Sequence, residues 1–132
     1  MVSPVEVLLI EHEEADRLLV GELLAVKGRG RVRVTEASDL QTALHLLGSR
    51  AFDLVLLDTK LPEVTALSAI RAVGERAPMT PILPHPAFIT VQARHRARER
   101  GPFDAVVHGD LNSMWSAVNK LLELNGDAAQ AH

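Results

Sequence analysis

The chain has 132 residues, 14 Lys and Arg against 17 Asp and Glu, and no cysteine. This length suits a single domain, and the absence of cysteine excludes disulfides, thiol catalysis and thiolate zinc sites. A formal net charge of −3 gives no overall positive field for nucleic acid. No apolar stretch approaches the ~20 residues that span a bilayer. We therefore expect a cytoplasmic protein that binds neither nucleic acid nor membrane through this domain.

The N-terminal part of the sequence predicts a buried strand followed by a helix. Residues 5–10 are almost wholly aliphatic, as in a strand covered on both faces. Residues 15–26 then repeat apolar side chains at helical spacing, and those expected on one face are Leu18, Leu19, Leu23 and Val26. The acids at the start of this helix, Glu13, Glu14 and Asp16, suit its positive end.

An edge strand and a second helix are predicted next. Residues 31–36 begin with alternating Arg and Val, and this period of two is typical of a strand with one face in water. Ser38 and Gln41 have the spacing of a capping box. We therefore expect a helix that begins there and ends near Gly48.

A second buried strand precedes another helix and a short strand. Residues 54–57 are a continuous aliphatic run that ends at Asp58. Thr65 can cap a helix that stops before Pro78. Residues 81–85 then predict a fourth strand, kept short by prolines that cannot donate to a ladder.

The last third of the chain continues the alternation. The elements expected there are a helix over residues 88–100, a strand over residues 103–107 and a helix capped by Asp110 with Leu111, Trp115, Val118 and Leu122 inward. Residues 125–132 are expected to form a disordered tail, which leaves one domain over residues 1–124.

Strands that alternate with helices predict an α/β fold, a doubly wound five-stranded parallel sheet with helices on both faces. Ligands of such sheets bind beyond the carboxyl ends of the strands. Glu11 and His12 follow the first strand, Asp58 the third, Pro86 the fourth and His108 the fifth. Two carboxylates at neighbouring strand ends repel each other unless a cation or a proton lies between them. A solvated rim with two unrelated acids is the alternative.

Three segments of the sequence carry a family resemblance. They are residues 8–11 (Leu-Leu-Ile-Glu) with 14–19 (Glu-Ala-Asp-Arg-Leu-Leu), residues 52–62 (Phe-Asp-Leu-Val-Leu-Leu-Asp-Thr-Lys-Leu-Pro) and residues 101–107 (Gly-Pro-Phe-Asp-Ala-Val-Val). In order and spacing they resemble the receiver domain of bacterial two-component response regulators, over residues 5–124. The resemblance implies a flavodoxin-like strand order, 2-1-3-4-5.

The resemblance also implies a phosphoacceptor site. Asp58 would take a phosphoryl group from the phosphohistidine of a partner histidine kinase, beside a bound Mg²⁺. Glu11 would be an acidic residue of the metal site, and the backbone carbonyl of Lys60 a further ligand. A hard cation on oxygen ligands neutralises charge during such a transfer. Docking of a signalling partner, or of a second copy in a homodimer, is expected on the fourth helix, fifth strand and fifth helix.

Several positions depart from the family pattern. His12 stands where a second acid is expected, Pro86 where a hydroxyl residue is expected, and His108 where a phosphoryl-binding lysine is expected. Ala105 replaces the switch aromatic, and Ala66 replaces a glycine after the acceptor loop. We therefore expect an atypical receiver with a degraded switch, which acts through protein–protein contacts and is not an enzyme.

Three alternatives remain open. The first is a pseudo-receiver, a binding module that works without phosphorylation. The second is a transition-metal site formed by Glu11, His12, Asp58 and His108, because imidazole and carboxylate together suit such metals. The third is a metal-dependent hydrolase at the same strand ends.

Overall fold

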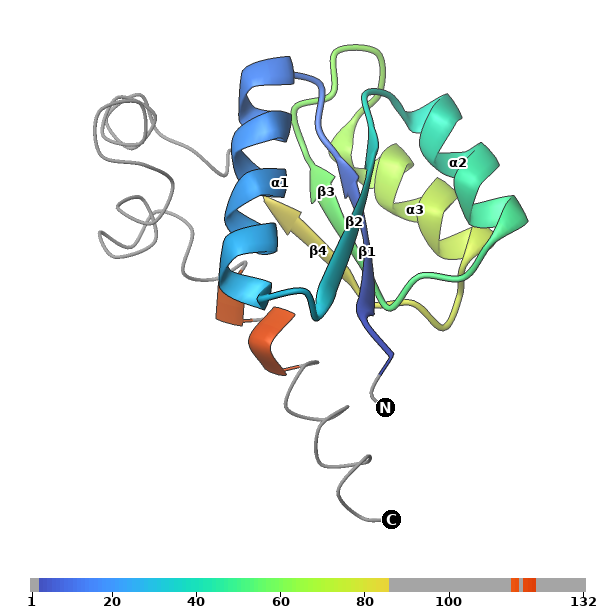
Figure 1. Ribbon diagram of the computed structural model, residues 1–132. Coiled ribbons are helices and arrows are strands. Elements are labelled where there is room, and N and C mark those ends of the chain that lie inside the picture. Colours follow the sequence, from blue (N-terminus) through green and yellow to red (C-terminus); the bar gives the residue numbers. More distant parts are fainter. Residues whose placement is uncertain (1–2, 86–114, 117, 121–132) are drawn as a thin grey trace.

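A computed structural model describes residues 3–85, 115–116 and 118–120 (Figure 1). Its strands and helices alternate in the order β1 (Val5–Ile10), α1 (Glu14–Gly28), β2 (Val32–Ala37), α2 (Leu40–Ser49), β3 (Leu54–Asp58), α3 (Ala66–Arg76) and β4 (Ile82–His85). Residues 115–116 and 118–120 are helical. The predicted helix over residues 88–100, the fifth strand and the tail lie outside the described residues.

The four strands form one parallel sheet in the order β2-β1-β3-β4. Helix α1 covers one face of this sheet, and α2 and α3 cover the other (Figure 1). The doubly wound α/β fold is thereby confirmed, and the described strands follow the expected order. Strand β2 is at the edge as predicted, although it begins at Val32, one residue later than expected.

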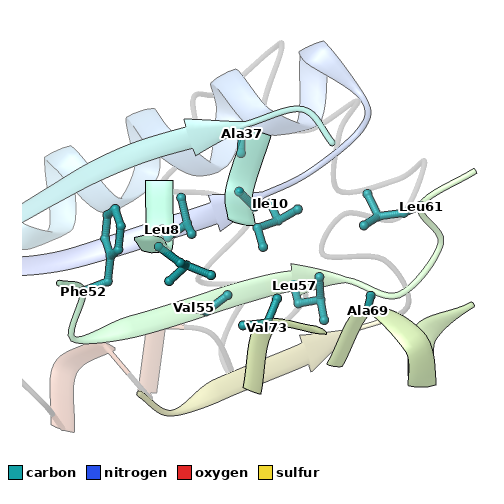
Figure 2. Packing of buried hydrophobic residues seen from close by; sticks show 11 residues of the cluster. Leu8, Ile10, Ala37, Phe52, Val55, Leu57, Leu61, Ala69 and Val73 are labelled. Atoms are coloured by element: carbon teal, nitrogen blue, oxygen red, sulfur yellow. The ribbon is translucent and has the colours of Figure 1, made fainter. Parts of the chain in front are cut away.

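Strand alternation divides the core into two layers. Val5, Val7 and Leu9 of β1 point into the layer under α1. Leu8 and Ile10 point into the opposite layer under α2 and α3 (Figure 2). Every residue of β3 is buried, and a fully buried aliphatic side chain contributes about 1.5–3 kcal/mol. The unbroken aliphatic runs of the sequence thus correspond to strands covered on both faces.

The buried face of α1 differs from the predicted one. Leu18 and Val26 are 57% and 45% exposed. The residues that face the sheet are Asp16, Val20, Leu23, Leu24 and Gly28. The prediction was right for Leu23, which is fully buried, and for Leu19, which packs against the core. It was wrong for Leu18 and Val26 because it assumed an all-apolar face, whereas Asp16 occupies the first inward turn. Helix α1 ends with Arg29 in the left-handed region, at φ 50°, and Gly30 continues the turn at φ 80°.

The caps of α2 and α3 test two further predictions. Asp39 caps α2, since its side chain accepts a hydrogen bond from the backbone N–H of Thr42 at 2.7 Å. Ser38 was predicted in this role, and the pattern could not separate two adjacent residues that both cap helices well. Thr65 caps α3 as predicted, accepting from the backbone N–H of Ser68 at 3.1 Å.

A helical segment far along the chain packs on the layer under α1. Val118 is fully buried in this layer, and Trp115 packs against it, as predicted. The ammonium of Lys27 lies 5.8 Å from the centre of the Trp115 ring, a cation–π contact at the end of α1. Within the described part of the chain, no helix has the length and apolar character needed to cross a membrane.

Candidate functional site at the carboxyl ends of the strands

Two acids lie at adjacent strand ends. Strands β1 and β3 are hydrogen-bonded neighbours in which Ile10 pairs with Leu57. Glu11 follows Ile10 directly, and Asp58 is the last residue of β3. The parallel register therefore brings Glu11 and Asp58 together, as the sequence predicts. Both are nearly inaccessible to solvent, with exposed fractions of 3% for Glu11 and 5% for Asp58.

Backbone amides of the following loops hold both carboxyls. The N–H of Lys60 donates to Oδ1 of Asp58 at 2.8 Å. The N–H of Glu13 donates to Oε1 of Glu11 at 3.2 Å. Each contact spans two residues, as in the turns that acidic side chains make with their own backbone. The loops therefore fix the positions of the two carboxyls.

The surroundings of Glu11 favour its protonated form. Burial is the main cause that raises the pKa of Glu11 from 4.5 to about 8, and the charge of Asp58 is the second. The side chains of Glu11 and Asp58 also hydrogen-bond with each other, which favours protonated Glu11. The hydrogen bond from the backbone N–H of Glu13 lowers the same pKa, but its effect is smaller than those of burial and of the Asp58 charge. At neutral pH, Glu11 is therefore largely protonated.

The donor set of this pair fits a hard divalent cation. Both side chains offer only oxygen, which Mg²⁺ prefers over imidazole or sulfur. A buried pair of acids lacks positive charge, and a cation can take the place of the proton on Glu11. In the described ranges, at this site or elsewhere, no group of three His, Cys, Asp or Glu side chains is placed to hold a metal ion. The pair is thus an incomplete cage that needs further oxygen ligands.

His12 is not part of the acid pair. Its side chain is exposed and lines a neighbouring cleft, while its backbone carbonyl accepts from Arg17 at 3.3 Å. The predicted transition-metal set therefore finds no support in the described residues. His108 lies outside them, together with Pro86 and Ala105, so the structure does not place these predicted site residues.

Asp16 is a third acid near the pair that the sequence interpretation missed. It is 8% exposed on the sheet-facing side of α1, and its charge also raises the pKa of Glu11. The interpretation assigned it only to the positive end of the helix. The signal that could have revealed it is its spacing of four and eight residues from Val20 and Leu24, which are both fully buried.

Comparison with known proteins identifies the family. The model of the response regulator receiver domain matches residues 7–118. The chain belongs to this family. The match covers the described sheet from Val7 onward and the segment that contains Trp115 and Val118, and it extends across the undescribed residues between them. The chain is therefore a receiver domain of two-component signalling, as the resemblance predicted.

A curated relative and two solved structures agree with this assignment. The response regulator protein PilR of Pseudomonas aeruginosa is 29% identical over 124 residues, which are 92% of this chain and 27% of PilR. The chain spans about a quarter of the length of the curated relatives it matches.

The receiver domain of sensor histidine kinase PA1611 from P. aeruginosa, solved with a magnesium ion in its active-site cleft, is 26% identical. Its TM-score is 0.55, with 75% of this chain and 77% of that chain covered. The complex of histidine kinase ThkA with response regulator protein TrrA matches at 23% identity and a TM-score of 0.57, over 67% of this chain and 73% of that chain.

Proposed function

We propose that this receiver domain accepts a phosphoryl group on the carboxylate of Asp58. The observation that supports this most directly is the buried pair of Glu11 and Asp58 at adjacent strand ends. Such a pair lacks positive charge, and a receiver domain needs a cation at this place for phosphoryl transfer. The magnesium ion in the cleft of the PA1611 receiver domain supports the same role for this pair.

Each residue of the site has a separate task in this proposal. The loop amide of Lys60 holds Oδ1 of Asp58, which orients the carboxylate so that its other oxygen can attack phosphorus in line. Glu11, Asp58 and the carbonyl oxygen of Lys60 would hold Mg²⁺. When bound, Mg²⁺ supplies positive charge to the oxygens of the transferred phosphoryl group. Glu11 would have to lose its proton to serve as a ligand of the cation.

The donor of the phosphoryl group is, in this proposal, the phosphohistidine of a histidine kinase. The phosphorus–nitrogen bond of the donor breaks as the bond to the Asp58 oxygen forms. The matching ThkA–TrrA complex contains a histidine kinase with a response regulator protein, which supports a kinase partner here. A cytoplasmic location and a homodimer through the C-terminal elements stay predictions.

Intact-mass spectrometry tests the proposal. The protein is incubated with acetyl phosphate and Mg²⁺, beside Asp58→Asn and the matched control Glu63→Gln, which changes an exposed acid of the same loop. We expect the mass of one phosphoryl group on the wild type and on Glu63→Gln, and none on Asp58→Asn. Absence of the modification from the wild type with both Mg²⁺ and Mn²⁺ would favour the phosphorylation-independent binding module.

The response to phosphorylation is proposed to be weak. Ala66 occupies the first position of α3, where the family has a glycine, and Pro86, Ala105 and His108 replace other parts of the switch. Amide spectra recorded before and after phosphorylation should therefore differ only close to Asp58. Spectral changes that extend to residues of the fifth strand and last helix would contradict a degraded switch.

A further inference from the structure

A cleft lies next to the acid pair, at the same end of the sheet. It has a volume of about 620 Å³, and its lining comes from the loops that follow β1, β2 and β3 and from the starts of α1 and α2. His12, which lines it, directly follows Glu11, and Leu61, which also lines it, directly follows Lys60. An occupant of this cleft therefore touches both loops that hold the acid pair.

The lining of the cleft combines an apolar floor with acidic walls. Leu40, Leu61 and Val64 supply aliphatic surface, with Leu61 buried and the other two half-buried. The charged side chains of the lining are Glu14, Asp39, Glu63 and Arg17, so carboxylates outnumber the guanidinium three to one. With His12 counted as neutral, the formal net charge of the lining is −2.

The charged side chains of the lining differ in their hydrogen bonds. The guanidinium of Arg17 donates to the carbonyls of Glu11 and His12, at 3.0 and 3.3 Å, so it is held against the β1–α1 loop. One oxygen of Asp39 accepts from the helix amide of Thr42. Glu14 and Glu63 are exposed. Within the described part of the chain, neither side chain makes a hydrogen bond or an ion pair.

We propose that this cleft docks a segment of a protein partner in which a basic residue lies between aliphatic residues. The basic side chain would contact Glu14 and Glu63, and the aliphatic side chains would cover Leu40 and Val64. Arginine fits best, because its planar guanidinium can bridge two carboxylates. The charge of the cleft favours this occupant over an acidic one, which the excess of carboxylates would repel. The docking does not depend on phosphorylation of Asp58.

Amide NMR with a defined peptide tests the proposal. The probe is acetylated and amidated Ala-Leu-Arg-Leu-Ala, titrated into the ¹⁵N-labelled, unphosphorylated protein. The control peptides replace the arginine with glutamine or with glutamate. We expect shift changes at Gln41, Glu63 and Val64 that saturate with the arginine peptide, weaken about fivefold with the glutamine peptide and vanish with the glutamate peptide.

Protein variants provide the second arm of the test. The double variant Glu14→Gln, Glu63→Gln should lower the affinity for the arginine peptide about fivefold, whereas Glu75→Gln, an exposed acid on α3, should leave it unchanged. The remaining amide spectrum shows whether each variant is folded. Absence of shift changes at millimolar peptide, equal changes with all three peptides, or full affinity in the double variant would each overturn the proposal.

Discussion

Glu11 and Asp58 lie side by side at the ends of adjacent parallel strands, both buried and hydrogen-bonded to each other. The strand register places them there, and the loop amides of Glu13 and Lys60 hold their carboxyls. Water cannot screen the two charges well at this depth, so the protonated form of Glu11 is favoured in the absence of a cation. Protonation, cation binding and stability are therefore linked at this site.

The first prediction concerns stability against pH. Glu11 has a pKa of about 8 in the folded chain and 4.5 as the ordinary value, so the folded state binds the extra proton between these limits. Its contribution to stability is complete below pH 4.5 and is lost as the pH rises to about 8, by at most about 1.4 kcal/mol per pH unit.

Urea unfolding of the wild type and of Glu11→Gln across this range measures the effect. The variant has no proton to lose at this position, so the difference between the two unfolding free energies should change steadily with pH. A difference that stays constant from pH 5 to pH 8 would show that Glu11 titrates normally.

The second prediction concerns cation binding. Because Glu11 is largely protonated at neutral pH, Mg²⁺ or Mn²⁺ should displace about one proton on binding at pH 7. Calorimetry in two buffers of different ionisation enthalpy counts the released protons. Glu11→Gln should release none, and Asp58→Asn should bind the cation at least tenfold more weakly. Binding by the wild type without proton release would contradict the raised pKa of Glu11.

The third prediction concerns Asp16. Its charge raises the pKa of Glu11 from the buried face of α1. Asp16→Asn keeps the size of the side chain and removes the charge, so the pKa of Glu11 should fall. Carbon-13 NMR of the Glu11 carboxyl can measure this shift, with Glu22→Gln on the exposed side of α1 as the control. Equal pKa values in both variants would remove Asp16 from the electrostatics of the site.

The fourth prediction compares two glycines at helical positions. A Cβ at Gly28 would lie 2.6 Å from Cγ2 of Val32, whereas at Gly74 it would meet nothing within 4 Å. Gly28→Ala should therefore lower the free energy of unfolding by about 1–3 kcal/mol. Gly74→Ala should raise it by about 0.5–1 kcal/mol, because alanine favours the helix. Thermal or urea unfolding of both variants checks the opposite signs, and shifts of the same sign would contradict the packing described for Gly28.

The sequence was sufficient to predict the sheet and the acid pair. Aliphatic runs ending at Glu11 and Asp58 identify two buried strands, and parallel strands bring their carboxyl ends to one edge. Thr65 was likewise identified as a cap because its side chain and position follow a local rule. The cap depends only on residues close to it in the sequence, and the acid pair depends only on the parallel arrangement of the strands.

Features that depend on the exact rotation of a helix could not be predicted in this way. Whether Asp16 or Leu18 faces the sheet is decided by packing of α1 against β1 and β2, which no local pattern records. The position of His12 outside the acid pair follows from the path of the β1–α1 loop, where Arg17 binds its carbonyl. The sequence showed that His12 departs from the family, but not where its side chain lies.

The titration of the Glu11 side-chain carboxyl, followed by carbon-13 NMR with and without Mg²⁺, tests the acid pair most directly. We expect a pKa near 8 without the cation and a value lower by at least one unit at saturating Mg²⁺. A pKa near 4.5 that Mg²⁺ does not change would contradict both the raised pKa of Glu11 and the cation site beside Asp58.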